Sequence, residues 1–270
     1  MKTYKETFSE LASLRRAALI PFFVIGDPDF DTSLAIVRTA IDAGADILEL
    51  GIPFSDPIAD GPTIQKADVR ALRSGMNVHK GLDFIRKLKE YRDIPIGLLM
   101  YYNLVYQYGV KKFFSEFHQA GVNSVLIADL SIDDADEIHD AAIAAGLDTV
   151  FMVTPNTEAE RMKLITSKTT GFIYTVSVLG VTGSREKLSD VVEELVGKLK
   201  KLTNVPVCVG FGISKPEHAQ AIVRAGADGV IIGSKIVELI ERHLRDKGRM
   251  LSDISGFVGQ FREAVEKSRG

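Results

Sequence analysis

Short apolar runs alternate with longer amphipathic stretches along the whole chain. The apolar runs contain few polar residues, which is typical of strands that are buried on both faces of a parallel sheet. The stretches between them have the apolar spacing of helices. The pattern predicts eight strands, at residues 18–25, 45–50, 94–101, 124–128, 149–153, 171–176, 206–209 and 229–232.

The alternation of strands and helices indicates the fold. Residues 3–15 predict an amphipathic helix before the first strand, with Phe8, Leu11 and Leu14 on one side, and such a helix could close the bottom of a barrel. Eight strand–helix units in roughly 250 residues match a (β/α)8 barrel, and an open doubly wound sheet is the main alternative. We therefore expect an α/β fold, a single (β/α)8 TIM barrel domain over residues 1–270 with an extra N-terminal helix and added helices.

Four segments share a boundary at which a helix ends on Ala-Gly and a strand follows. Glycine can adopt the left-handed conformation that closes a helix. When the segments are aligned on this glycine, one strand position holds Leu126, Phe151 and Ile231 in three copies and Glu49 in the fourth. Three apolar residues and one acid at the same point indicate that the acid was placed for chemistry. The four glycines are Gly44, Gly121, Gly146 and Gly226.

The strand that carries Glu49 opens into a loop that carries a second carboxylate, Asp60. An isolated ionised carboxylate in a buried strand costs several kcal/mol, so Glu49 needs a partner or must take up a proton. A buried carboxyl at the end of a strand and a second one on the following loop predict an acid/base pair. The alternative is that Glu49 is a structural ion-pair partner and that Asp56 and Asp60 are turn residues.

Three glycine-bearing loops follow the last three predicted strands, at residues 180–184, 210–214 and 233–234. In barrels of this kind, the loops after strands seven and eight often hold a phosphate together with a helix N-terminus. Glycine lets backbone N–H groups approach closely, and the helix start carries partial positive charge, so no Lys or Arg is needed. The loops therefore predict a phosphorylated ligand, with residues 179–187 as a lid. Alternatively, the glycines only form turns and Ser234 is a helix cap.

The composition argues against several other classes of protein. A net charge of −3 and a pI near 6.0 give no basic surface for nucleic acid. No apolar run is long enough to span a bilayer, and the polar start MKTYKETFSE lacks the apolar core of a signal peptide. The single cysteine, Cys208, excludes an internal disulfide and suits a reducing compartment. These features together predict a cytoplasmic protein. No histidine has metal-ligand spacing, so we expect no metal site.

The segment LELGIPFSDPIADG, residues 48–61, resembles the signature of the tryptophan synthase alpha subunit family. Further motifs occur in the matching order, so that the resemblance covers almost the whole chain. It implies a (β/α)8 lyase that cleaves indole-3-glycerol phosphate to indole and glyceraldehyde 3-phosphate by a retro-aldol step, the alpha reaction of tryptophan biosynthesis. The further motifs are PF at 21–22, GDP at 26–28, GPTIQ at 61–65, MY at 100–101 with Asn103, GVTG at 180–183 and GFGI at 210–213.

The same resemblance implies a role for individual residues. Glu49 would protonate indole C3 and help to remove the proton of the glycerol hydroxyl, and Asp60 would stabilise positive charge at the indole nitrogen. Burial would raise the pKa of Glu49, while Asp60 on its loop would stay ionised. The implied substrate-binding residues are Phe22, Leu99, Tyr101, Met152, Tyr174, Phe211 and Ile231. The implied phosphate-binding residues are Gly183, Gly212, Gly233 and Ser234.

The resemblance also implies a partner. A pyridoxal-phosphate-dependent beta subunit would receive the indole through a tunnel in an α2β2 assembly, and the alpha chain itself would need no cofactor. We expect the loop from Pro53 to Asp60 to expose apolar side chains to this partner. The expected contact residues are Phe54, Pro57 and Ile58 on the loop, with Tyr102 and Asn103 beyond it.

Two other functions compete with this interpretation. Another phosphosugar barrel enzyme, an isomerase or epimerase, would use the same phosphate-binding loops. A catalytically silent barrel, kept only to activate its partner, is a second alternative. The presence of both Glu49 and Asp60 argues against the silent barrel.

Overall fold

The computed structural model describes residues 1–176, 185–210 and 212–267, with the backbone alone for residues 185–190 and 267. In this part of the chain, nine parallel strands form one sheet in the order β5-β4-β3-β2-β1-β9-β8-β7-β6. Only Val150 separates β5 from β6, so the sheet closes into the expected barrel. The strands are β1 (Ala18–Val24), β2 (Leu48–Gly51), β3 (Ile96–Met100), β4 (Ser124–Ile127), β5 (Asp148–Thr149), β6 (Phe151–Val153), β7 (Ile173–Val176), β8 (Val207–Gly210) and β9 (Gly229–Ile232).

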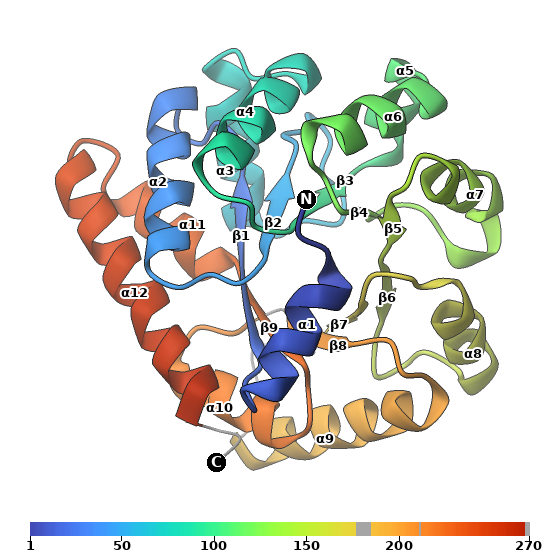
Figure 1. Cartoon of the computed structure of the whole chain (residues 1–270). Coiled ribbons are helices and arrows are strands. Elements are labelled where there is room, and N and C mark those ends of the chain that lie inside the picture. Colours follow the sequence, from blue (N-terminus) through green and yellow to red (C-terminus); the bar gives the residue numbers. More distant parts are fainter. Residues whose placement is uncertain (177–184, 211, 268–270) are drawn as a thin grey trace.

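Helices surround the strands on the outside of the barrel (Figure 1). The structure adds a short helix after β3 that the sequence pattern did not predict, α5. No described helix is both long and apolar enough to cross a membrane. The helices are α1 (Tyr4–Ser13), α2 (Phe30–Asp42), α3 (Pro62–Arg73), α4 (Val78–Tyr91), α5 (Tyr102–Tyr108), α6 (Val110–Ala120), η1 (Ile132–Asp134), α7 (Asp136–Ala144), α8 (Ala159–Lys168), α9 (Arg185–Leu202), α10 (Pro216–Arg224), α11 (Ser234–Arg242) and α12 (Lys247–Lys267).

The helix–strand boundaries repeat one arrangement of hydrogen bonds. All four glycines of the repeated boundary have positive φ angles, as expected. In three of the four copies, a polar residue two positions after the glycine accepts a hydrogen bond through its side chain. The donor is the backbone N–H at the start of the strand that precedes the helix. This contact fixes where each of these strands begins. The pairs are Asp46 with Leu19 at 2.9 Å, Asn123 with Ile96 at 2.9 Å and Asp228 with Val207 at 2.8 Å.

The predicted fifth strand is interrupted at Val150, and it also begins one residue earlier than the pattern of the other strands predicts. The earlier start changes the face on which its side chains lie. The strand β5 begins two residues after Gly146, whereas β4 and β9 begin three residues after their glycines. A shift of one residue exchanges the two faces of a strand. Val150 and Met152 therefore pack in the barrel interior, and Phe151 packs in the outer layer against the helices. The alignment of Phe151 with Glu49 was wrong, but Leu126 and Ile231 do lie in the interior.

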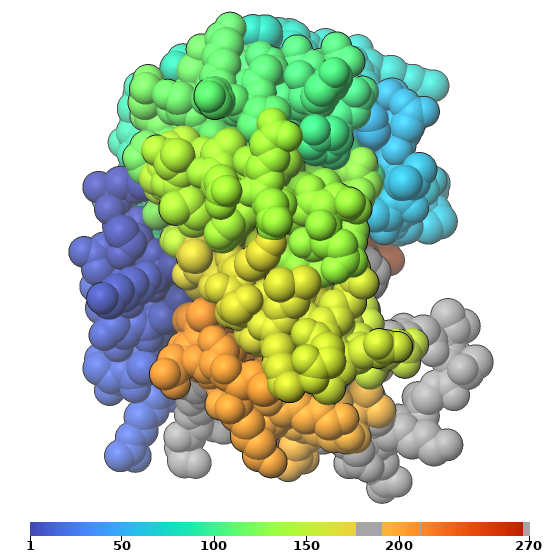
Figure 2. All heavy atoms as spheres, turned by 90° about the vertical axis from the view of Figure 1, so that its right-hand side faces the viewer, coloured from blue at the N-terminus to red at the C-terminus, as the bar shows by residue number. Residues whose placement is uncertain are grey.

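Helix α1 closes the bottom of the barrel. Tyr4 is 2% exposed, and its hydroxyl shares a hydrogen bond of 2.7 Å with the Ser124 hydroxyl. Its ring packs edge-on against Phe172. Leu11 is buried as expected, but Leu14 lies beyond the end of the helix and is 68% exposed. In Figure 2, the N-terminal segment covers one side of the body formed by the middle of the chain.

The closed bottom leaves no room for a side chain at Gly97. A methyl group there would lie 2.7 Å from the Tyr4 hydroxyl oxygen and 2.9 Å from the Ser124 hydroxyl oxygen. We expect Gly97→Ala to lower the free energy of unfolding by about 1–3 kcal/mol, measured by urea unfolding. The control is Gly81→Ala in α4, which meets no atom within 4 Å and should raise stability by up to about 1 kcal/mol. Equal effects of the two changes would contradict this packing.

Candidate active site

The strand β2 holds Glu49 inside the barrel between Phe22 of β1 and Gly97 of β3. The side chain is 4% exposed, and its Oε2 atom has no hydrogen-bond partner among the described residues. Burial, followed by the nearby charge of Asp60, raises the pKa of Glu49 to about 8. Glu49 is therefore protonated at neutral pH rather than part of a structural ion pair.

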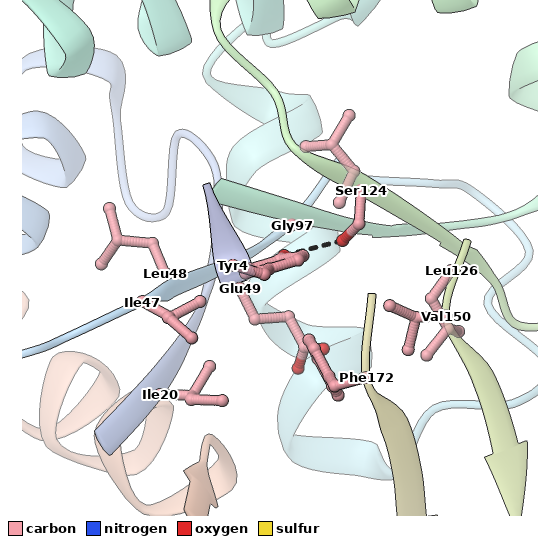
Figure 3. Close-up of a pocket in the computed structure, with 11 residues that line it drawn as sticks. Tyr4, Ile20, Ile47, Leu48, Glu49, Gly97, Ser124, Leu126, Val150 and Phe172 are labelled. Carbon is pink, nitrogen blue, oxygen red and sulfur yellow. Dashed lines mark hydrogen bonds between the residues drawn. The ribbon is translucent and has the colours of Figure 1, made fainter. Parts of the chain in front are cut away.

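Mostly apolar side chains surround Glu49 on the side toward the bottom of the barrel, together with Tyr4 and Ser124, as Figure 3 shows. The hydrogen-bonded Tyr4 and Ser124 side chains fill the space beside Gly97 and satisfy each other. Water has no access from this side, so Glu49 keeps its raised pKa. The apolar residues around it are Ile20, Ile47, Leu48, Leu98, Leu126, Val150 and Phe172.

Tyr101 positions Asp60, the second carboxyl. The Tyr101 hydroxyl donates a hydrogen bond of 2.7 Å to Asp60 Oδ2 and accepts one of 3.0 Å from the backbone N–H of Ala59. The Phe54 ring stacks on the Tyr101 ring with 5.0 Å between centroids. Burial raises the pKa of Asp60, and the Tyr101 hydrogen bond opposes this shift. Asp60 is thus a half-buried, oriented carboxyl rather than a freely solvated loop residue.

One cavity of about 410 Å³ connects the two carboxyls with the start of α11. Its inner wall is mostly apolar, and its outer wall is formed by the loop after β8 and the first turns of α11. Tyr174 lies in the inner wall, and burial raises its pKa well above the ordinary value. Nine of the predicted site residues line the cavity: Phe22, Glu49, Asp60, Leu99, Tyr174, Gly212, Ile231, Gly233 and Ser234.

Two other predicted site residues in the described part of the chain are not among those that line this cavity. Tyr101 contacts Asp60 but does not line the cavity. Met152 packs in the barrel interior against the cluster that contains Tyr174 and Ile231, but the cavity it lines is a separate one of about 140 Å³. Gly183, Phe211 and residues 179–184 of the predicted lid lie outside the described residues.

The start of α11 lines the cavity through Gly233, Ser234 and Lys235. Gly233 is its N-cap residue, and no side chain caps the helix. The interpretation of Ser234 as a helix cap was therefore wrong. A methyl group on Gly233 would lie 3.2 Å from the Cβ atom of Phe22, so the glycine allows the close approach of this ring. Unpaired N–H groups at a helix start can bind an anion.

A family model described as tryptophan synthase alpha chain matches residues 8–266. The chain belongs to the tryptophan synthase alpha chain family. It is 47% identical over 262 residues to the tryptophan synthase alpha chain of Methanothermobacter thermautotrophicus, and the match covers 96% of this chain and 97% of that protein. It is 42% identical to the protein of the same name from Vibrio vulnificus, over 99% of this chain and 100% of that protein. The resemblance found in the motifs is thereby confirmed.

Solved structures of tryptophan synthases have the same fold. The alpha subunit from Legionella pneumophila superposes with a TM-score of 0.90 at 31% identity over 98% of each chain. A chain of the tryptophan synthase a2b2 complex from Pyrococcus furiosus superposes with a TM-score of 0.83 at 38% identity, over 91% of this chain and 98% of that chain. Both agreements extend over nearly the full length of the barrel.

The chain contains a buried acidic residue near the site that the sequence pattern did not identify. Asp68 of α3 is 5% exposed, and its Oδ2 atom has no partner among the described residues. Burial and then the charge of Asp60 raise the pKa of Asp68 to about 7, whereas the backbone N–H of Phe54 opposes the shift. Its position on the apolar face of α3, with Ile64 and Ala71, was the signal that could have identified it.

The raised pKa of Glu49 predicts how stability depends on pH. The unfolded side chain ionises near 4.5, while the folded one holds its proton up to about 8. Stability is therefore lost as the pH rises between these values. Relative to Glu49→Gln, the wild type should lose up to roughly 5 kcal/mol of unfolding free energy across this interval, measured by urea unfolding at several pH values. Parallel curves for the two proteins would mean that Glu49 titrates normally.

Proposed function

We propose that this chain cleaves indole-3-glycerol phosphate to indole and glyceraldehyde 3-phosphate, the alpha reaction of tryptophan biosynthesis. The observation that carries the proposal is the pair of carboxyls in one cavity, one buried with a pKa of about 8 and one fixed by a tyrosine. Membership of the tryptophan synthase alpha chain family supports it. The chain is thus a carbon–carbon lyase.

Glu49 serves as the proton donor and acceptor of the retro-aldol step. The bond between indole C3 and the adjacent glycerol carbon breaks, C3 gains a proton, and the hydroxyl on that carbon loses one as the aldehyde forms. A carboxyl that is protonated at neutral pH can supply the first proton, and its carboxylate can then accept the second. Glu49 returns to its starting state, so the step balances without another reactant.

Asp60 stabilises the charge that develops during this step. Protonation at C3 places positive charge on the indole nitrogen, and an oriented carboxylate lowers the energy of that state. Tyr101 fixes the carboxylate, so it need not reorganise during the reaction. The apolar side chains of Phe22, Leu99 and Ile231 provide a wall for the flat indole ring.

The phosphate binds at the opposite end of the cavity. Gly212, Gly233 and Ser234 line the cavity, where α11 starts without a side-chain cap and its first backbone N–H groups can bind an anion. Gly183 and Phe211 remain predictions from the sequence. The long cavity thereby holds the phosphate and the indole ring of one substrate molecule at its two ends.

A beta subunit is the proposed partner, in an α2β2 assembly of the kind named for the Pyrococcus furiosus relative. Ile58 is 83% exposed on the loop from Pro53 to Asp60, but Phe54 and Pro57 are half-buried. The expectation that all three lie in the open therefore holds for Ile58 alone, and Phe54 is partly covered because it stacks on Tyr101. Contact at Ile58 would act on the same loop that carries Asp60. Tyr102 and Asn103, at the start of α5, are the other proposed contacts.

We further propose that the alpha chain needs no metal or organic cofactor of its own, with pyridoxal phosphate bound by the beta subunit. The proposed reaction uses only the proton transfers by Glu49 and the charge stabilisation by Asp60. We also propose that residues 1–270 act as one domain and that the protein works in the cytoplasm, since tryptophan biosynthesis supplies protein synthesis there.

The role of Glu49 is tested by Glu49→Gln, which keeps the shape of the side chain and removes the proton donor. We expect indole release from indole-3-glycerol phosphate to fall by at least roughly 10²–10⁴-fold. Circular dichroism and binding of the beta subunit should be unchanged. Near-normal turnover in this variant would overturn the assignment.

The proposed interface is tested by Ile58→Ser. We expect the dissociation constant for the beta subunit, measured by calorimetry, to rise about tenfold because a central apolar contact is lost. The control is Ile143→Ser on α7, another exposed isoleucine, at 41% exposure. A similar affinity for both variants would place the interface elsewhere.

A further inference from the structure

The outer wall of the cavity contains a lysine in an unfavourable position. Lys235 is the second residue of α11 and lines the same cavity as Glu49 and Asp60. The start of a helix carries partial positive charge, so a cation there is disfavoured. The first turn of α11 contains no acidic residue to offset it. A side chain that breaks such a local rule at the wall of a cavity is typical of a functional residue.

The partner of Lys235 holds it only weakly. The ammonium group donates a hydrogen bond of 2.8 Å to the Oε2 atom of Glu238, one turn further along α11. The two side chains are 32% and 44% exposed, and Glu238 also lines the cavity. Pairs of this kind on a helix surface contribute only about 0.2–0.5 kcal/mol. The ammonium group is therefore available to a stronger anion beside Gly233 and Ser234.

We propose that Lys235 binds the phosphate group of the substrate and that Glu238 holds the lysine ready until the phosphate arrives. This inference rests on the proposed function and deepens it. A phosphate ester carries a charge of about −1.5 to −2 at pH 7, which the partial charge of a helix start offsets only in part. Lys235 supplies the remaining positive charge. This proposal departs from the expectation that the glycine loops bind the phosphate without Lys or Arg.

The chain contains a matched pair that lies away from the cavity. Glu241, also on α11, forms an ion pair of 3.1 Å with Lys66 of α3. Neither residue is among those that line the cavity. Replacing Lys66 therefore removes one lysine and one α11 ion pair without changing the proposed phosphate site.

The experiment compares Lys235→Met with Lys66→Met in the full chain. For Lys235→Met we expect the KM for indole-3-glycerol phosphate to rise roughly tenfold with kcat nearly unchanged, because the phosphate lies away from the reacting atoms. The inhibition constant of glycerol 3-phosphate should rise by a similar factor, whereas the affinity for indole, which has no charge, should not change. Lys66→Met should leave all these values unchanged.

Two further variants sharpen the test. Lys235→Arg should restore most of the affinity, because it keeps the charge. Glu238→Gln should lower the inhibition constant of glycerol 3-phosphate by a few-fold, because it removes the anion that competes for Lys235.

The inference is overturned if Lys235→Met changes the KM no more than Lys66→Met, or if indole affinity falls as much as glycerol 3-phosphate affinity. The test separates this inference from the proposed function. Failure of the wild type to cleave indole-3-glycerol phosphate would refute the function, while a Lys235-dependent affinity for glycerol 3-phosphate would still support the phosphate site.

Discussion

Among the described residues, the Oε2 atom of the buried Glu49 has no hydrogen-bond partner, and the rest of the site depends on this carboxyl group. Desolvation favours the protonated form, so the pKa moves to about 8. A salt bridge would have stabilised the ionised form instead and abolished the donor. The cavity therefore combines an acid that holds its proton with Asp60, an acid fixed by a hydrogen bond from Tyr101. The two carboxyls thus suit the different roles proposed for them, because their surroundings differ.

The two ends of the barrel make this difference possible. At the bottom, Tyr4 of α1 reaches the interior and pairs with Ser124 beside Gly97, so water cannot reach Glu49 from below. At the top, the cavity opens toward the start of α11. The acid is thus accessible to a substrate from one side only, which is the condition for proton transfer without exchange with bulk water.

Much of this arrangement could be predicted from the sequence, because Glu49 and Asp60 interrupt a regular pattern of apolar strands and glycine-ended helices. Contacts between distant residues could not be predicted. The hydrogen bond between Tyr101 and Asp60 joins residues 41 positions apart, and no local pattern encodes it. Phe151 was assigned to the wrong face because one connection is a residue shorter than the others. Asp68 and Lys235 were overlooked because charged residues on helices usually face solvent.

The hydrogen bonds between polar side chains and backbone N–H groups at the strand starts have a consequence for the evolution of the barrel. Asp46, Asn123 and Asp228 each tie the start of a strand to the next unit, at the end away from the cavity. These hydrogen bonds fix the register of the strands without help from the loops that line the cavity. Insertions or replacements in those loops can then alter substrate choice while the framework stays in place, so this architecture readily acquires new reactions.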